Sequence, residues 1–207
     1  MADPSRRRTE KRDLITEAAV EVFAEKGFHQ ARVSDIAKRA GVADGTIYLY
    51  FKNKEDLLLS IFEEKMDVLL DGMNDALRDC DDPLERVRRF AQHHFMQVRE
   101  NRSAAEVLQV ELRLSNKFLK EYRPEKLWAY LNIFATIVRD GQASGVFRSD
   151  IDPFIAMWGF FGGLDEIAMQ WVLAKNQRRI QLEEAARQVA EIYIRGMLEH
   201  PNNSEES

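Results

Sequence analysis

Three hydroxyl side chains and one cation lie close together near the N-terminal end of the sequence. Thr46, Tyr48 and Tyr50 alternate along the chain, and Lys54 follows them. Hydroxyl groups donate hydrogen bonds to phosphate oxygens, and tyrosine rings pack on sugars and thymine methyl groups. A lysine on the same side adds a positive charge for the phosphates. This combination of side chains predicts contacts with the backbone and bases of DNA.

A cluster of positive charge precedes these residues. We expect a basic arm that reaches phosphates or the minor groove, formed by Arg6, Arg7, Arg8, Lys11 and Arg12. Residues 1–54 contain 11 Lys and Arg against 8 Asp and Glu, whereas the remaining residues contain 19 against 27. The net charge of −5 therefore conceals a basic N-terminal module joined to an acidic body.

Two short helices joined by a glycine-containing turn are expected to position the hydroxyl groups. Ser34 is a candidate N-cap for a helix over residues 35–40, Gly41 ends that helix, and a second helix is expected over residues 44–50. The residues expected to face the core are Ile36, Ala37, Ala40, Ile47 and Phe51. This arrangement is a helix-turn-helix, whose helix N-termini also attract phosphate. The pattern alone equally fits an ordinary all-α domain with half-buried tyrosines.

The rest of the chain predicts further helices and an all-α fold. Residues 14–26 form one apolar stripe that Gly27 ends, and Asn53 is expected to cap a long helix. A helix is expected to start at Asp81-Asp82-Pro83, and the later ones cover residues 104–114, 124–142, 152–175 and 182–199. No useful length of the sequence alternates with period two, so we expect little or no β-sheet. Residues 201–207 are polar and are expected to be a disordered tail.

The segment from Ile15 to Ile61 resembles the DNA-binding domain of TetR-family regulators. The shared residues include Ala18-Ala19, Gly27-Phe28, Ile36-Ala37 with Ala40-Gly41-Val42, and Gly45-Thr46-Ile47-Tyr48 with Tyr50-Phe51, Lys54 and Leu57. The resemblance implies about nine helices and a homodimer that binds a palindromic DNA operator. It implies DNA-binding residues at Ser34, Asp44, Gly45, Thr46, Tyr48, Tyr50 and Lys54.

Two of those positions carry specific expectations. Gly45 matches a family position at which the backbone approaches the duplex. Asp44 departs from the family, where many members have a small or hydroxylated residue. A carboxylate at that position either repels phosphate or accepts a hydrogen bond from a cytosine amine. The domains expected from this resemblance are a DNA-binding domain over 9–54 and an effector-binding and dimerisation domain over 55–200.

A narrower resemblance connects the chain to the FadR-type branch of the family. Residues 42–56 and the stretch Gln109-Val-Glu-Leu-Arg-Leu-Ser-Asn116 carry it. This branch represses fatty-acid degradation genes and releases DNA on binding long-chain acyl-CoA, so we expect that amphipathic effector and no cofactor. The expected ligand-binding residues are Phe95, Arg99, Leu108, Leu112, Arg113, Lys117, Trp128, Phe134 and Phe161. An efflux repressor that responds to another amphipathic molecule is the alternative within the family.

The physical basis for this pocket is a surplus of apolar bulk beside a group of cations. Aromatic and aliphatic residues of the C-terminal body can line a tunnel for an acyl chain, or they can simply fill a core. Arg113 is the preferred partner for a CoA phosphate, and Glu111 and Asn116 are weaker candidates. The last two long helices carry apolar stripes, which predict a four-helix interface between subunits. In the alternative, these stripes pack only within one subunit.

Several function classes find no support in the sequence. The most apolar run, residues 154–164, is about half the length of a membrane span, and no apolar region typical of a signal peptide follows the arginines near residue 6. With a single cysteine, Cys80, this predicts a cytoplasmic protein. Nucleophile and phosphate-loop motifs of enzymes are missing. His93 and His94 are adjacent, so only one is expected to point inward, which disfavours a metal site.

Two hypotheses from other classes complete the set of readings. The first is an enzyme that acts on acyl thioesters in the same pocket. Sustained turnover of acyl-CoA would support this hypothesis. The second is a helical dimer without a role on DNA, which a failure to shift DNA from its own upstream region supports. The leading hypothesis remains a homodimeric repressor.

Overall fold

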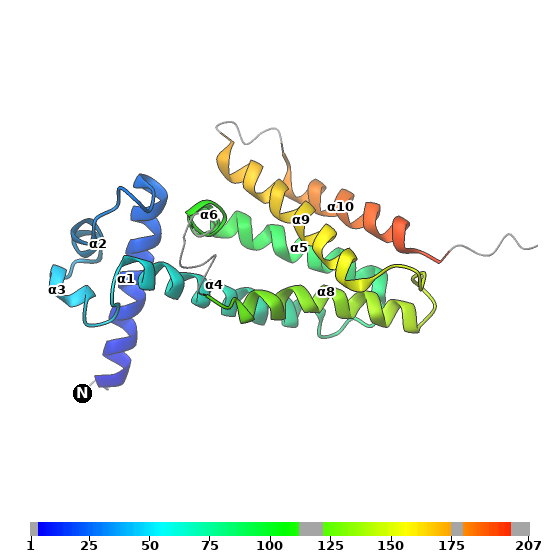
Figure 1. Ribbon diagram of the computed structural model, residues 1–207, viewed down its shortest axis with the longest axis horizontal. Coiled ribbons are helices and arrows are strands. Elements are labelled where there is room, and N and C mark those ends of the chain that lie inside the picture. The colour runs from blue at the N-terminus through cyan, green and yellow to red at the C-terminus, as the bar shows by residue number, and fades with distance from the viewer. Residues whose placement is uncertain (1–3, 112–121, 175–179, 200–207) are drawn as a thin grey trace, which may run out of the picture. The chain divides into compact units, whose positions relative to one another are not determined.

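The computed structural model describes residues 4–111, 122–174 and 180–199, which form nine α-helices and one π-helical segment (Figure 1). In these ranges the β-structure is limited to an isolated bridge between Phe147 and Leu198. The expected all-α fold is thereby confirmed. The chain divides into two compact units, one with Met1–Asp67 and Asn101–Pro124, the other with Val68–Glu100 and Glu125–Ser207. The first unit therefore contains more of the chain than the predicted DNA-binding domain.

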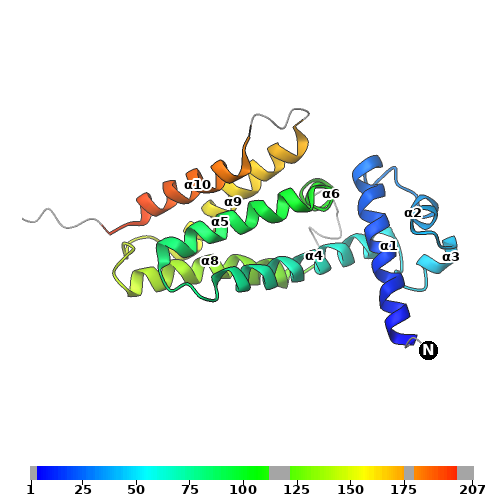
Figure 2. The ribbon, with the colours of Figure 1, turned by 180° about the vertical axis from the view of Figure 1, so that it is seen from behind.

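Helices of the first unit form where the apolar spacing predicts them. They are α1 (Pro4–Lys26), α2 (Val33–Ala40), α3 (Asp44–Ile47), the start of α4 (Lys54–Leu77), α6 (Arg102–Glu106) and the π-helical segment η1 (Val107–Glu111). In Figures 1 and 2, α2 and α3 lie on the same side of α1. Arg39 of α2 pairs with Glu21 and Glu25 of α1, at 2.6 and 2.7 Å. Gly27 and Gly41 have φ of 74° and 68°, the left-handed conformation of helix C-caps.

The helix-turn-helix differs from the prediction at two helix ends. Ser34 is not the N-cap of α2, because the helix begins at Val33 and Arg32 holds the N-cap position. The carboxylate of Asp35 accepts from the Arg32 backbone N–H at 3.2 Å and so starts the helix earlier. The second helix was expected over 44–50, but α3 ends at Ile47. Beyond it the Leu49 and Tyr50 amides donate to carbonyls three residues back, which are tighter turns than an α-helix.

The residues of the expected basic arm form the first part of α1. Arg6 pairs with Glu10 one turn later, at 2.9 Å. Arg12 pairs with Glu64 of α4, and its guanidinium lies 5.5 Å from the centre of the Phe51 ring. Arg12 therefore joins α1 to α4 within the unit. The side chains of Arg7, Arg8 and Lys11 stay exposed.

The second unit consists of helices, and side chains cap the N-termini of two of them. It contains the end of α4 together with α5 (Pro83–Glu100), α8 (Glu125–Ala143), α9 (Pro153–Leu173) and α10 (Leu182–Met197). Asp82 accepts from the Leu84 amide at 3.1 Å, and Asp152 accepts from the Phe154 amide at 2.7 Å. Asn53 caps α4 in the first unit by accepting from Asp56 at 2.8 Å, as its position predicted. These carboxylates and amide satisfy backbone N–H groups that lack partners in the helix.

The expectation that only one of His93 and His94 points inward is wrong, because both side chains are buried. Helix α5 is covered on more than one side. His93 hydrogen-bonds the backbone of Leu69 and packs against Gly72, both on α4, whereas His94 Nδ1 lies 2.9 Å from Tyr130 Oη on α8. Consecutive residues point about 100° apart on a helix, so a central helix buries both of them.

The helix predicted over 104–114 has a different form. Helix α6 ends at Glu106, and η1 follows with π-type hydrogen bonding up to Glu111. Residues 112–114 lie outside the described residues, as does the predicted tail over 201–207. Among the helices that the structure describes, none is long and apolar enough to cross a bilayer.

Candidate nucleic-acid interface and effector site

In the turn after α3, Tyr48 faces solvent, whereas Ile47 and Phe51 on either side of it are buried. Ile47 and Phe51 are each 2% exposed, so both face the core as the spacing predicted. Tyr48, between them, is 57% exposed, and Tyr50 is half-buried beside Phe51 with ring centres 6.4 Å apart. Tyr48 is therefore not a core residue of this unit, and its ring and hydroxyl face outward. This arrangement leaves the predicted contact positions available on one short stretch of chain.

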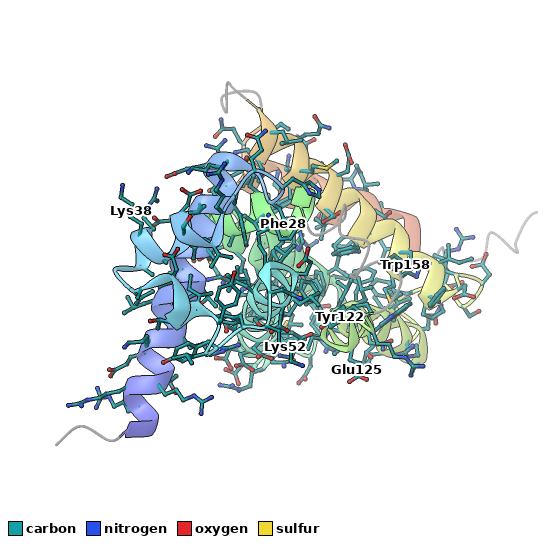
Figure 3. All side chains as sticks on the ribbon, turned by 60° about the vertical axis from the view of Figure 1, so that its left-hand side comes forward. Phe28, Lys38, Lys52, Tyr122, Glu125 and Trp158 are labelled. Carbon is teal, nitrogen blue, oxygen red and sulfur yellow. The ribbon has the colours of Figure 1, made fainter. Side chains whose placement is uncertain are left out.

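Side chains that the pattern analysis passed over extend this surface. Leu49 is 74% exposed between the two tyrosines, and an exposed leucine here suits a thymine methyl group. Lys52 and Lys38 are also exposed, and Figure 3 shows Lys38 at the outer edge of α2. Their signal in the sequence is only a positive charge close to the helix-turn-helix. Such charges serve phosphate binding as readily as the tyrosine hydroxyl groups do.

Gly45 has no structural reason to be glycine within its own unit. A Cβ atom at this position meets no atom within 4 Å, and its φ is not in the left-handed region. Asp44 and Gly45 are exposed at the N-terminus of α3, Thr46 is half-buried, and Ser34 is exposed on α2. A missing Cβ on an exposed surface allows the close approach of a large partner to the backbone.

Lys54 has partners inside the first unit. Its ammonium group donates to the backbone carbonyls of Phe28 and Ala31, the latter at 3.0 Å, and lies 3.4 Å from that of His29. The same nitrogen is 4.4 Å from the centre of the Phe28 ring. An ammonium group has three donors, and these carbonyls engage them. The predicted DNA contact of Lys54 stays a prediction, and the structure adds a second role in joining α4 to the loop after α1.

We expect Lys54→Ala to lower the free energy of unfolding by about 2 kcal/mol, because it leaves polar carbonyls without their charged donor. Chemical denaturation of the variant measures this loss. Lys52→Ala is the control, since Lys52 is exposed. Equal stability of the two variants contradicts the structural role of Lys54.

The aromatic residues of the second unit form a connected core. Phe134 and Phe160 stack with ring centres 4.0 Å apart, and Phe90 contacts both of them edge-on. Phe134 and Phe95 are both buried, as expected of residues deep in an apolar site or core. Phe161 is half-buried, with its ring 6.2 Å from that of His94.

Aromatic side chains also gather at the surface of this unit. Trp128 of α8 stacks on Phe154 of α9 at 6.3 Å and meets Trp158 edge-on at 5.5 Å. The three are between 40% and 54% exposed, so the part of Trp128 in ligand binding stays a prediction for a side chain at the surface. Trp158 lies on α9 (Figure 3) and also contacts Phe161, at 6.4 Å. Ring contacts thus run from the exposed cluster to the interior.

The predicted ligand residues that the structure describes belong to both units. Leu108 belongs to η1 in the first unit, whereas Phe95, Arg99, Trp128, Phe134 and Phe161 belong to the second. Arg99 is exposed and pairs with Glu183 of α10. Leu112, Arg113 and Lys117 lie outside the described residues, as does Asn116, and nothing is assigned to the side chain of Glu111. In the ranges that the structure describes, no group of His, Cys, Asp and Glu side chains is placed to hold a metal ion.

Comparison with known families covers nearly the whole sequence. Residues 15–61 match the family described as bacterial regulatory proteins, tetR family, and residues 62–196 match the YsiA-like protein, C-terminal region. The chain belongs to the TetR family. The predicted resemblance is thereby confirmed, and TetR-family membership makes the chain a DNA-binding transcriptional regulator, not an enzyme.

Relatives of known description place it in one branch of the TetR family. The fatty acid metabolism regulator protein of Bacillus subtilis (strain 168) is 41% identical over 183 residues, which cover 88% of this chain and 93% of the relative. The crystal structure of FadR from Bacillus subtilis in complex with stearoyl-CoA matches with a TM-score of 0.81, covering 89% of this chain and 98% of that one. FadR from Bacillus halodurans, at 36% identity, has a TM-score of 0.82 over the full length of both chains.

Proposed function

We propose that this TetR-family regulator is a homodimeric repressor of fatty-acid degradation genes that long-chain acyl-CoA releases from its operator. The observation that carries the proposal is the 41% identity with the Bacillus subtilis FadR whose structure contains stearoyl-CoA. Residues 9–54 bind DNA in this proposal, and residues 55–200 bind the effector and form the dimer. The chromosome is its partner, which puts its site of action in the cytoplasm.

The DNA-binding proposal is supported by the outward-facing turn after α3. Two helix-turn-helix units in a dimer reach half-sites about one helical turn apart, which requires a palindromic operator. The residues proposed to contact DNA are Ser34, Asp44, Gly45, Thr46, Tyr48, Tyr50 and Lys54. Leu49 and Lys52 join them because both are exposed beside the tyrosines.

We expect Gly45→Ala to reduce operator affinity about ten-fold or more while leaving the fold as stable as before. The added methyl group meets no atom of its own unit, and alanine favours a helix by up to about 1 kcal/mol over glycine. The same methyl group stands between the backbone and the duplex, and a loss of 1.4 kcal/mol is a factor of ten. Gel-shift titration with DNA from the upstream region of its own gene measures the affinity.

Gly196→Ala is the matched control, because Gly196 is an exposed helical glycine whose added Cβ also meets no atom within 4 Å. It is expected to bind the same DNA as tightly as the native protein. Native affinity in Gly45→Ala contradicts a close approach of DNA at this position.

The effector proposal is supported by the aromatic core of the second unit. The residues proposed to bind acyl-CoA are Phe95, Arg99, Leu108, Leu112, Arg113, Lys117, Trp128, Phe134 and Phe161. The pair with Glu183 is exposed, and exposed ion pairs contribute little, so a CoA phosphate can replace that carboxylate on Arg99. A ligand shifts the equilibrium between DNA-bound and free dimer only by its difference in affinity for the two states.

Palmitoyl-CoA is expected to release the protein from DNA, and free CoA at the same concentration is expected to leave the complex intact. The gel-shift assay described above measures both, in moderate salt and below the concentration at which palmitoyl-CoA forms micelles. Release by both compounds contradicts an acyl site, and release by neither contradicts acyl-CoA as the effector. If the protein alone hydrolyses palmitoyl-CoA, free thiol is released. That result contradicts the proposal that the protein acts only as a regulator.

The homodimer is supported by apolar side chains on the last two helices. Ile155, Trp158 and Leu173 are exposed on α9, and Ile192 is exposed on α10. Exposed apolar patches of this kind mark surfaces that a protein partner covers. We assign Ile155, Leu173 and Ile192 to the interface with a second subunit, which sedimentation equilibrium of the native protein tests directly.

A further inference from the structure

A histidine and a tyrosine form a polar pair inside the aromatic core of the second unit. Tyr130 is fully buried, and its hydroxyl oxygen is 2.9 Å from His94 Nδ1. The rings of Phe95, Tyr130 and Phe161 lie 5.6, 6.2 and 6.2 Å from the imidazole centre. His94 Nε2 is buried and has no hydrogen-bond partner among the described residues. A buried polar atom without a partner is costly, so its presence here requires an explanation.

The protonation state of the pair follows from its surroundings. Burial lowers the pKa of His94 to about 4 and raises that of Tyr130 well above its usual value, so both are neutral at pH 7. If Nδ1 carried the proton, both the Tyr130 hydroxyl hydrogen and the Nε2 lone pair would lack partners. If Tyr130 donates to Nδ1, only one group stays unpaired, which is the Nε2 hydrogen. The second arrangement leaves fewer unsatisfied groups and is favoured.

A path of aromatic rings connects this N–H donor with the protein surface. Trp158 is 40% exposed and contacts Phe161, which in turn contacts both His94 and Tyr130. Tyr130 in turn contacts the buried ring of Phe90, and Phe90 contacts that of Phe134. A long amphipathic molecule that follows these rings from Trp158 meets the buried imidazole of His94 between apolar side chains. Acyl-CoA has one matching acceptor, the thioester carbonyl, between its pantetheine arm and its alkyl chain.

We propose that His94 donates a hydrogen bond from Nε2 to the carbonyl oxygen of the acyl thioester. This contact makes His94 the residue that distinguishes thioesters from other amphipathic molecules of equal length. The inference rests on the proposed function, and it adds that the buried site recognises the thioester carbonyl of the ligand. A site that hydrogen-bonds a polar group discriminates strongly against an analogue that lacks it, because its own donor is then left unpaired.

The experiment compares two ligands that differ by one carbonyl oxygen. Palmitoyl-CoA carries the thioester, and S-hexadecyl-CoA is the thioether with the same chain. Isothermal titration of the native dimer is expected to show about ten-fold tighter binding of palmitoyl-CoA, the effect of one buried hydrogen bond. The measurement uses binding to the whole protein and needs no DNA.

Three variants locate the source of that preference. His94→Phe removes the donor and is expected to bind both ligands equally. His94→Gln places an amide N–H near the position of Nε2 and is expected to keep the preference. His93→Gln is the matched control and is also expected to keep the preference. The Nε2 atom of His93 is likewise buried without a partner, but its ring lies against Gly72 of α4 and not against the aromatic rings.

Each outcome decides between the inference and the proposed function. Equal binding of both ligands by the native protein overturns the role of His94 and leaves acyl-CoA as the effector. Binding of neither ligand removes the proposed effector and the inference together. If His94→Phe does not fold, ¹⁵N-histidine spectra of the native protein decide, because palmitoyl-CoA but not the thioether must shift the Nε2 proton signal. A preference that survives in folded His94→Phe also overturns the inference.

Discussion

Replacing Gly141 with alanine is expected to lower the free energy of unfolding of the second unit by about 3 kcal/mol. Gly141 is buried in α8, and a Cβ atom there comes within 2.1 Å of Phe147 Cδ2 and 2.5 Å of Phe147 Cε2. Phe147 has little room to move away, because its ring is buried and its amide donates to the Gly141 carbonyl at 3.0 Å. Overpacking of this kind forces the backbone to shift.

Urea denaturation followed by circular dichroism measures the effect on Gly141→Ala. Gly196→Ala serves as the control, since its added methyl group meets no atom and is expected to cost nothing. Gly141→Ala combined with Phe147→Leu is expected to lose less than the sum of the two single changes, because the smaller side chain gives room for the methyl group. Unchanged stability of Gly141→Ala means that Phe147 does not occupy this position.

Acidification is expected to destabilise the native protein by about 3 kcal/mol more than it destabilises His94→Phe. Burial lowers the pKa of His94 from 6.5 to about 4 in the folded chain. Between these two values the unfolded chain binds a proton that the folded chain does not, so stability falls as the pH falls from 6.5 to 4. Burial also lowers the pKa of His93, which adds to the effect in both proteins.

The measurement is the free energy of unfolding at several pH values for each protein. Carboxylates contribute a pH dependence of their own, but they are common to both proteins and cancel in the difference between the two curves. The lower baseline of His94→Phe does not matter, because only the slopes are compared. Parallel curves between pH 6.5 and 4 contradict a neutral, buried His94.

Helix faces and most helix ends could be predicted because they depend on local spacing. Ile47 and Phe51 are four residues apart and both point into the core, and Asn53 caps the helix that its position predicted. The family was equally predictable, since its motif residues lie in one continuous segment. These features are determined by neighbours along the chain.

The roles of polar residues could not be predicted in the same way. A lysine suits a phosphate and a backbone carbonyl equally well, so only the fold shows that Lys54 meets the carbonyls after α1. The burial of His93 and His94 together depends on helices that cover α5 from different sides. Ser34 has the side chain of an N-cap, but the Asp35 carboxylate makes Arg32 the first capping residue. Long-range packing decides each of these cases.

The hydrogen bonds from Lys54 to the carbonyls of Phe28 and Ala31 bear on how effector binding can affect DNA binding. Helix α4 is continuous from Lys54 to Leu77 and contributes residues to both units. Because the first residue of α4 holds these two carbonyls, we expect a rotation at the start of this helix to move the loop between α1 and α2 with it. In the proposed homodimer, such a movement is expected to change the distance between the two helix-turn-helix motifs while the hydrogen bonds of Lys54 stay intact.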